Sequence, residues 1–394
     1  MDVSAGIKPF LRRIYLYNFL DDFILIYPLY AVMFTEKGIT PLQLGILFTV
    51  WSVTTFLLEV PSGAWADRYS RKHILFSGQL IRAMGYACWL MIPSFGGFLM
   101  GFVFWGVESA LSSGTLQALI YDELKLFGRE ADFTRVIGRC RTFSLIGLVT
   151  GAFLASPGIL LGYPFVLMAS IVTVLTAGLI IVTLPQAHRV EVTGEEAYFT
   201  TLKSGLKGAL RQPAVLRFIV FLALVTALPG ALDEYWTVFA DEVGLPDYGL
   251  GIFLGLLCGL EAIGSYFAHY VEKRPDRYFH FLFFFIGLML LLAAWWFTIA
   301  ALFLLIVFTL TATVIQIIFE GRIQHAIEGN VRATISSVGG FFTEIGAFIV
   351  YFTFGWMAED RSYQEAFGIY GMVIILVGLI YLILNWKVVG IGKL

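Results

Sequence analysis

The sequence predicts an all-α membrane protein with twelve transmembrane helices, arranged as two six-helix halves. Of its 394 residues, 59% are hydrophobic and only 14% are charged, whereas soluble globular proteins have about 25% charged residues. Its apolar runs are close to the roughly 20 residues that a helix needs to cross the hydrocarbon core. In chain order, the expected helices cover residues 12–35, 42–63, 73–93, 97–120, 140–161, 164–184, 214–238, 247–270, 279–297, 299–319, 334–357 and 367–387.

Two adjacent carboxylates, Asp21 and Asp22, interrupt the first expected helix. A charge at the centre of a transmembrane helix costs roughly 2.5–3.5 kcal/mol on insertion scales, so the pair indicates a paired or functional position. The acidic pair, the length of the run and the lack of a small-residue cleavage site distinguish this helix from a cleavable signal peptide.

Adjacent residues on a helix point about 100° apart, so Asp21 and Asp22 are expected to have different surroundings. Asp22 shares a face with Asn18, which favours a position facing a polar cavity. Asp21 shares a face with Pro28, and Arg82 in the third expected helix is its candidate partner. Neutralising the two carboxylates one at a time should therefore give different phenotypes.

The basic residues predict the orientation of the protein in the membrane. Of the 26 Lys and Arg residues, all but Lys37, Arg82 and Arg361 lie in the N-terminus, the even-numbered loops or the C-terminus, or at the helix ends beside them. Because cytoplasmic loops are enriched in Lys and Arg, both termini are expected in the cytoplasm. The same alternation supports the count of twelve spans.

The longest loop, residues 185–213, is expected to be a cytoplasmic linker between an N-terminal half, 1–184, and a C-terminal half, 214–394. The two halves resemble each other in sequence. "GITPLQLGILFTVW" from Gly38 aligns with "GLPDYGLGIFLGLL" from Gly244 at a constant offset of 206 residues. Such an internal repeat is typical of transporters built from two six-helix units.

The most specific stretch, "EVPSGAWADRYSRKHI" at residues 59–74, lies in the loop after the second expected helix. It resembles the GxxxDRxxRK pattern that the major facilitator superfamily carries at this place, with Ser70 where that pattern usually has glycine. The resemblance extends over the whole sequence and implies the fold of that family. The matching residues are Gly63, Asp67, Arg68, Arg71 and Lys72.

Each part of this loop also has a physical role of its own. Gly63 permits close approach of a neighbouring backbone, and Asp67 suits the positive N-terminal end of a facing helix. The two arginines can form charge-assisted bonds to Asp122 and Glu123, at the end of the fourth expected helix. In the family that the loop resembles, such a network latches the two halves in the outward-facing state. The alternative is that the basic residues only anchor the loop.

The second half keeps part of this loop. At the offset of 206, the two arginines fall on Arg274 and Arg277, whereas Lys273 replaces Asp67. Retention of the basic positions at the corresponding loop favours duplication over a chance match.

Two further stretches resemble drug-exporter branches of the superfamily. "NVRATISS" at residues 330–337 resembles the RATxxS pattern that begins helix eleven there. "GLVTGAFLASPG" in the fifth expected helix keeps the glycine spacing of an antiporter motif at Gly147 and Gly151, but Ala152 stands where that motif has proline. The match to that motif is therefore partial.

Several further ionisable residues lie at membrane depth, where such groups face a cavity, a partner or an ion path rather than lipid. A carboxyl group that alternates between wet and dry surroundings binds and releases protons near neutral pH. Glu59 and Glu234 are close enough to the membrane–water interface to be solvated there, which would explain their charge without a functional role. The candidates for proton coupling and the substrate cavity are Asp21, Asp22, Arg82, Glu108, Asp233, Glu261 and Glu344.

These features predict a secondary active transporter that moves a small amphipathic molecule by alternating access, with proton-coupled export as the first interpretation. Acidic residues outnumber basic ones at depth, and the sequence holds 37 Phe, 18 Tyr and 9 Trp, which suits neutral or cationic organic substrates. The alternative is a proton-coupled importer on the same fold. The expected location is the plasma or inner membrane, and the expected partners are substrate, protons and lipid.

Other classes of function have little support in the sequence. Cys88, Cys140 and Cys258 form no CxxC spacing, and no metal-ligand cluster, nucleophile motif or phosphate-binding loop is present. We therefore expect no enzyme activity, cofactor, metal or nucleic-acid partner. The resemblance further implies a monomer.

Overall fold

The computed structural model describes residues 3–184, 213–326 and 332–384. Within these ranges, the side chains of residues 3–6, 60, 64, 67, 213–218, 323–326 and 332–338 are not described. The described part is helical without a strand, as the sequence predicts. Residues 185–212 of the expected linker and residues 330 and 331 of the 330–337 stretch lie outside the described residues, and the rest of that stretch is described by its backbone alone.

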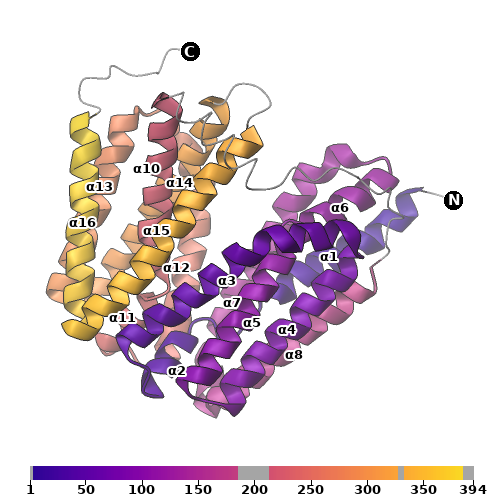
Figure 1. Ribbon diagram of the computed structural model, residues 1–394, viewed down its shortest axis with the longest axis horizontal. Helices are drawn as coiled ribbons and strands as arrows, with labels where there is room; N and C mark the ends of the chain where they lie inside the picture. The colour runs from indigo at the N-terminus through magenta and orange to yellow at the C-terminus, as the bar shows by residue number, and fades with distance from the viewer. Residues whose placement is uncertain (1–2, 185–212, 327–331, 385–394) are drawn as a thin grey trace. The chain divides into compact units, whose positions relative to one another are not determined.

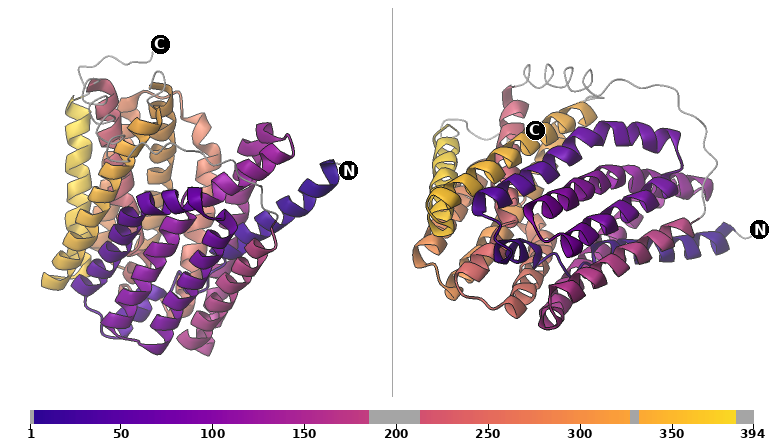
Figure 2. Two further views of the ribbon diagram at one scale, coloured as in Figure 1. Left: turned by 45° about the vertical axis from the view of Figure 1, so that its right-hand side comes forward. Right: turned by 60° about the horizontal axis from the view of Figure 1, so that its bottom comes forward.

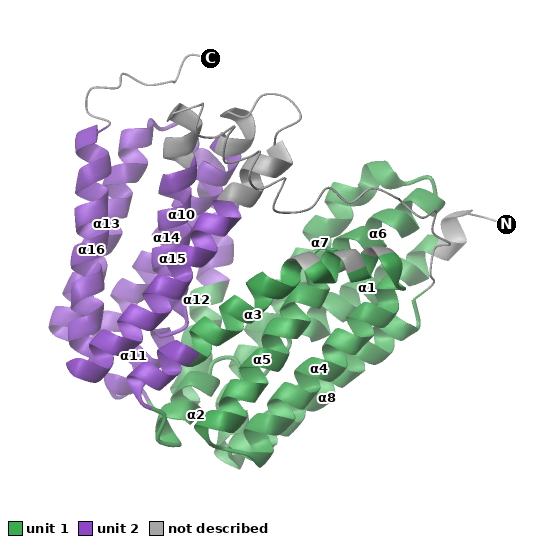
Figure 3. Cartoon of the chain, viewed as in Figure 1, with its two compact units in different colours: residues 1–39, 47–194, 246–258 green, residues 40–46, 195–245, 259–394 purple. Residues whose placement is uncertain are grey.

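The protein forms two compact units (Figure 3). Unit 1 comprises residues 1–39, 47–194 and 246–258, and unit 2 comprises residues 40–46, 195–245 and 259–394. The start of α3 (Pro41–Arg68) belongs to unit 2, and the first half of α12 (Asp247–Phe267) belongs to unit 1 (Figure 3). Figure 1 labels the helices, and Figure 2 shows the same ribbon from two further sides. The helices of the first half are α1 (Val3–Asp22), α2 (Tyr30–Glu36), α3 (Pro41–Arg68), α4 (Arg71–Met91), α5 (Phe95–Ser112), α6 (Thr115–Leu126), α7 (Phe133–Gly158) and α8 (Tyr163–Val182), with short 3₁₀ turns at Glu130–Asp132 and Ile159–Leu161.

The second half contains α10 (Pro213–Asp233), α11 (Trp236–Glu242), α12 (Asp247–Phe267), α13 (Asp276–Trp296), α14 (Leu302–Ala326), α15 (Arg332–Asp360) and α16 (Tyr363–Leu384), with 3₁₀ turns at Ala268–Tyr270 and Ile299–Ala301. In unit 1, α4 packs against α5 and α8, and α1 packs against α7 and α8. In unit 2, α13 packs against α16 and α14, and α10 packs against α15. Polar side chains of α1, α4 and α5 reach one another across this unit, as the ion pairs of Arg82 show.

The offset of 206 residues reappears in the structure. α11 begins and ends 206 residues after α2, and α12 begins 206 residues after α3. The glycine that follows each short helix, Gly38 or Gly244, has a positive φ of 84° or 86°, a conformation that glycine adopts without steric cost. The duplication inferred from sequence is thus visible in helix boundaries and turns.

Each of the twelve expected spans overlaps a helix, but their ability to cross a membrane differs. Among the described residues, nine helical spans are long and apolar enough to do so alone, and a tenth consists of α10 and α11, bent by 44°. α4 falls short because Gln79 and Arg82 lower its hydropathy. α1 carries charges at both ends and stops at Asp22.

The prediction of one continuous helix over residues 12–35 is wrong, because the structure breaks between Asp22 and Tyr30. Pro28 has no N–H to donate to the helix. The carbonyl of Asp21 accepts a bond from Arg82 instead (3.2 Å), and the N–H of Ile26 donates to Ser170 (3.1 Å). Pro28 therefore shares no helix face with Asp21. The seventh expected helix, 214–238, is likewise interrupted after α10.

Glycines allow α1 to lie close against α7. A Cβ at Gly147 would fall 2.1 Å from the carbonyl oxygen of Phe19, and a Cβ at Gly151 would fall 3.0 Å from the backbone nitrogen of Ile24. Both positions belong to the glycine motif that the sequence singles out. In this structure both glycines permit close helix packing. α7 therefore lies directly against the end of α1 and against the non-helical segment that follows Asp22.

Candidate functional site

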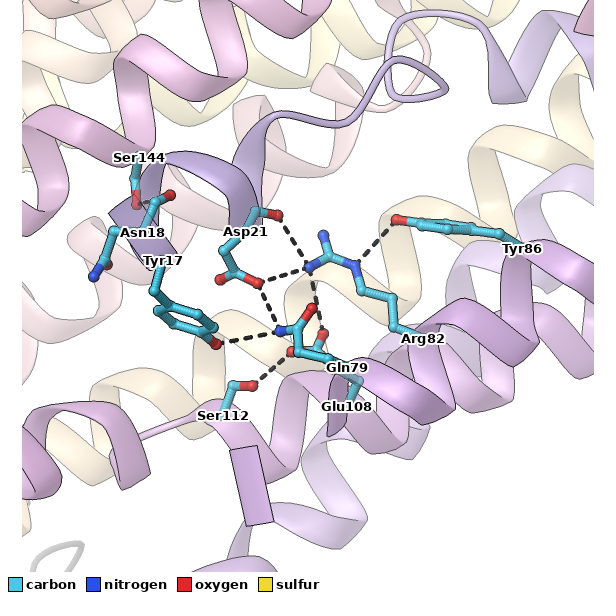
Figure 4. Close-up of polar contacts among 9 residues, drawn as sticks. All are labelled: Tyr17, Asn18, Asp21, Gln79, Arg82, Tyr86, Glu108, Ser112 and Ser144. Atoms are coloured by element: carbon cyan, nitrogen blue, oxygen red, sulfur yellow. Dashed lines mark hydrogen bonds and ion pairs between the residues drawn. The ribbon is translucent and has the colours of Figure 1, made fainter. Parts of the chain in front are cut away.

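A buried ionic cluster lies in unit 1, where side chains from the end of α1, the middle of α4 and the last turns of α5 come together (Figure 4). It brings together three of the residues that the sequence singles out, Asp21, Arg82 and Glu108. Arg82 and Glu108 are each only 4% exposed, and the side chain of Asp21 is 22% exposed. Buried charges need partners because an unpaired charge in a dry interior is very unfavourable.

Arg82 lies between two carboxylates that come from different helices. Its Nη1 is 3.1 Å from Oδ1 of Asp21 and 4.0 Å from Oε2 of Glu108, and its Nε donates to the hydroxyl of Tyr86 (3.0 Å). Ser112 donates to the other oxygen of Glu108 (2.6 Å). The expected Asp21–Arg82 pair is present, and Glu108 is a second partner within reach of a small side-chain movement.

Aromatic rings surround the guanidinium of Arg82. The ring centroids of Tyr27, Trp105 and Tyr86 lie 5.5, 5.7 and 6.0 Å from its central carbon. Tyr27 and Trp105 stack on each other with centroids 5.3 Å apart. A cation above an aromatic face is stabilised electrostatically, so these rings hold the charge in place while limiting access of water.

The side chain of Gln79, which is fully buried, also contacts the cluster and was not among the residues predicted from sequence. Its Nε2 donates to Oδ1 of Asp21 (2.8 Å) and to the hydroxyl of Tyr17 (3.2 Å). A signal was present, since Gln79, Arg82 and Tyr86 are spaced three and four residues apart. That spacing places them on one helix face, which forms a polar stripe along an apolar helix.

Asp22 has different surroundings from Asp21, as expected, but the prediction that Asn18 marks a cavity-facing side is wrong. Asn18 is buried, its amide donates to the carbonyl of Ile14 within its own helix (2.7 Å), and its backbone carbonyl accepts from Ser144 of α7 (3.3 Å). This face of α1 therefore packs against α7. Asp22 itself is half-buried at the helix end.

The loop that joins α3 to α4 is tied to α6 by an arginine. Nη1 of Arg71 pairs with the carboxylate of Asp122 and donates to the carbonyl of Ala118 (2.7 Å). Lys72 donates to the carbonyl of Leu184 at the end of α8 (3.4 Å). The expected bond from this loop to the end of the fourth span is therefore present. Glu123, its other candidate partner, is almost fully buried on α6.

Other residues of the same motif behave differently. A Cβ built on Gly63 meets no described atom within 4 Å, so the close approach expected at this glycine stays a prediction. Gly63 lies on an exposed turn of α3, where no described neighbour requires it. Arg68 is exposed at the end of α3. The side chain of Asp67 lies outside the described residues, so its expected helix-terminal contact stays a prediction.

Unit 2 contains the remaining acidic candidates. Asp233 ends α10 and interacts electrostatically with Glu234 and with Glu261 of α12, and Glu261 accepts a hydrogen bond from Thr313 of α14. Glu344 is half-buried on α15. The sequence has no Lys or Arg at positions 218–272, 278–321 or 333–360. The helices that carry these acids therefore supply no basic residue at membrane depth, in contrast to α4 in unit 1.

The described parts of the protein contain no group of three or more His, Cys, Asp and Glu side chains that could hold a metal ion. What the site offers is a set of carboxylates, one buried guanidinium and a fully buried amide. Such a set can bind and release protons and can bind cations, because its charges are mutually compensated only in part.

Comparison with known proteins places this arrangement in a family. The sequence model of the Major Facilitator Superfamily matches residues 14–351. An uncharacterized MFS-type transporter, YxaM of Bacillus subtilis (strain 168), is 23% identical over 235 residues, which are 58% of each protein. Multidrug resistance protein 2 of the same organism is 23% identical over 197 residues, covering 50% of this sequence and 48% of that one. The matched region thus spans about half the length of these relatives.

Solved structures share the fold over nearly the whole length of the protein. The nucleoside transporter NupG has a TM-score of 0.74 at 14% identity, and the match covers 98% of this protein and 100% of NupG. A bacterial homolog of the human lysosomal transporter Spinster has a TM-score of 0.76 at 12% identity, covering 98% and 97%. A D-xylose–proton symporter has a TM-score of 0.71 at 12% identity, covering 98% and 99%. At these identities the likeness concerns the fold alone.

Proposed function

This protein belongs to the Major Facilitator Superfamily, and we propose that it exports a small amphipathic organic molecule in exchange for protons. As a member, it is a multi-pass membrane transporter and not an enzyme. The proposal goes further, to proton coupling, to the direction of transport and to a neutral or cationic substrate. The observation that supports it is the position of Arg82 between Asp21 and Glu108.

Proton coupling follows from the balance of charges in this cluster. If Asp21, Asp22 and Glu108 are all ionised, three negative charges surround one guanidinium at membrane depth, where each charge is costly. Uptake of a proton by one carboxyl group lowers this cost. Because Arg82 can pair with either Asp21 or Glu108, protonation of one carboxyl group favours pairing with the other. The cluster thus has two arrangements that differ by one proton.

The substrate class is inferred from unit 2. Asp233, Glu261 and Glu344 lie on helices without Lys or Arg at membrane depth. A cationic group of a substrate would compensate their charge, and the many aromatic side chains of the protein suit its apolar part. In this proposal, unit 2 contributes acidic groups to substrate binding, and unit 1 contributes the proton-binding cluster.

We propose that the Arg71–Asp122 pair takes part in gating. The pair ties the loop between α3 and α4 to α6 within unit 1. The loop and α6 are joined by this ion pair and therefore move as a rigid body. Alternating access requires rigid-body movements of this kind. We further propose that the protein works as a monomer in the plasma or inner membrane, with both termini in the cytoplasm and without a cofactor.

The test uses purified protein in proteoliposomes with an imposed pH gradient and ethidium, a fluorescent lipophilic cation, as the probe. Proton-coupled export predicts ethidium movement against its gradient and opposite to proton flow, and its loss when a protonophore is added. Asp21→Asn and Asp22→Asn should each lower this accumulation, to different extents. Glu59→Gln, at an exposed position of α3, is the matched control and should transport normally.

The direction of flux separates export from the alternative, a proton-coupled importer. Movement of probe in the same direction as protons would support an importer. Accumulation that persists in Asp21→Asn, Asp22→Asn and Glu108→Gln would contradict the proposed proton site. Identical phenotypes for the two aspartate variants would contradict the inference that their roles differ.

A further inference from the structure

Only one of the two polar atoms of the Gln79 amide forms hydrogen bonds in this structure. Its Nε2 donates to Asp21 and to Tyr17, whereas its Oε1 is buried and has no hydrogen-bond partner among the described residues. The whole side chain is 0% exposed. An unpaired acceptor in such a position is unfavourable, so its presence at a charged cluster requires an explanation.

The direction of these hydrogen bonds is set by the charge on Asp21. An ionised carboxylate can only accept hydrogen bonds, and Oδ1 of Asp21 already accepts from Arg82 at 3.1 Å. Gln79 must therefore present its N–H group to that oxygen, which leaves its own Oε1 without a partner. The nitrogen and oxygen of an amide are assigned from such partners, and an ionised Asp21 would permit only one assignment.

A proton on Asp21 would reverse the requirement. The carboxylic acid has an O–H group to donate, and a half-turn of the amide brings Oε1 to the place of Nε2. Oε1 can then accept from both Asp21 and Tyr17, because a tyrosine hydroxyl can donate as well as accept. The reversed arrangement gives Oε1 two partners and moves the NH2 group to the buried position that Oε1 occupies now.

We infer that Gln79 is a positioning residue whose amide turns over when Asp21 takes up a proton, and so supports both protonation states of that carboxyl group. The inference rests on the proposed proton coupling of the cluster. In the reversed state the proton from water is bonded to the carboxyl oxygen of Asp21, and Arg82 pairs with Glu108, which stays ionised. No other covalent bond is made or broken.

The surroundings leave few other groups to exchange this proton. The parts of α7 and α8 at residues 142–158 and 164–182 contain no charged residue. The titratable and charged groups that interact with Asp21 come from α1, α4 and α5, and they are Tyr17, Asp22, Arg82, Tyr86 and Glu108.

Infrared difference spectroscopy between acidic and alkaline buffer tests this inference on the full-length protein in lipid, without any ligand. The wild type should show two coupled changes on acidification, a carboxylic C=O band from Asp21 and a shift of the amide C=O band of a glutamine. Asp21→Asn should lose both changes. Gln79→Met, which has a similar length but no amide, should lose the glutamine shift and keep a carboxylic band.

Labelling the amide carbonyl of glutamine with ¹³C in the wild type shows that the band comes from a glutamine, and its loss in Asp21→Asn links it to Gln79, which contacts Asp21, even if Gln79→Met does not fold. A carboxylic band from Asp21 without a glutamine shift would overturn the inference, because Gln79 would then be only a donor. A glutamine shift that persists in Asp21→Asn would overturn it as well.

The same preparation separates this inference from the proposed function. If no carboxylic band depends on Asp21 but ethidium transport still follows the pH gradient, the role of Gln79 is refuted while proton coupling stands. If the coupled infrared changes are present but the pH gradient drives no transport of ethidium, the rotation of the Gln79 amide stands and the proposed export is refuted.

Discussion

Replacing Arg82 with methionine should destabilise the protein strongly. The substitution keeps an unbranched side chain among the rings of Tyr27 and Trp105 but removes the only guanidinium in contact with Asp21 and Glu108 among the described residues. Two carboxylates then remain without their cation. The backbone carbonyl of Asp21 also loses the hydrogen bond that Arg82 donates to it at the end of α1 (3.2 Å).

The magnitude follows from the burial of the group. Arg82 is 4% exposed and Glu108 is 4% exposed, so solvent screens the pairing only weakly. Removal of one partner from a buried ion pair costs about 3–5 kcal/mol. For a protein of this length each kcal/mol lowers the midpoint of thermal unfolding by about 2 °C. We therefore expect a fall in Tm of about 6–10 °C.

Thermal unfolding in detergent, followed by intrinsic fluorescence, measures this effect. Arg135→Met, at an exposed arginine of α7, is the matched control and should change stability by less than about 0.5 kcal/mol. The double variant Arg82→Met/Asp21→Asn should recover at least half of the loss, because it no longer leaves Asp21 charged. A fall in Tm no larger than that of the control, or a double variant no more stable than the single one, would refute the role assigned to this ion pair.

Three other substitutions test other parts of the molecule. Gly147→Val places carbon atoms against the carbonyl of Phe19 and should destabilise the packing of α1 on α7 by about 1–3 kcal/mol, so an unchanged Tm would contradict this contact. Asp122→Arg should slow ethidium transport severalfold, and the exchange Arg71→Asp/Asp122→Arg should restore part of the rate, whereas a slower double variant would argue against pairing. Glu261→Gln should raise the ethidium concentration for half-maximal transport about tenfold, equivalent to about 1.4 kcal/mol, with little effect on a neutral dye of similar size.

Charge and hydropathy were enough to predict the helical membrane fold and two ion pairs. The pairs Asp21–Arg82 and Arg71–Asp122 could be anticipated because a charge at membrane depth or in a tight loop needs a partner, and few partners exist. The break after Asp22 could not be anticipated from periodicity. It depends on a carbonyl capped by Arg82, a contact between residues 61 apart in sequence.

The ion pair of Glu108 could not be predicted from the sequence either, because it also joins two helices. Glu108 has no charged neighbour on its own helix, and its cation comes from α4. Gln79 was missed because a single neutral amide carries little signal in a list of charges. Its meaning comes from its burial and from its spacing relative to Arg82, which matter only once the partner on α1 is known.

The two halves keep the same helix boundaries but differ in chemistry. At the offset of 206, Asp21 corresponds to Ala227, and Glu261 corresponds to Thr55. The turns that set the backbone are retained, as the positive φ of each glycine before α3 and α12 shows. Because the backbone of each half does not require its acidic residues, those residues could diverge in function. A cluster that contains its own cation can store a proton without a ligand, whereas acids on helices that carry no basic residue at membrane depth favour a ligand that brings a cation. We therefore expect Asp21→Asn to alter the pH dependence of transport, and changes in unit 2 to alter the choice of substrate.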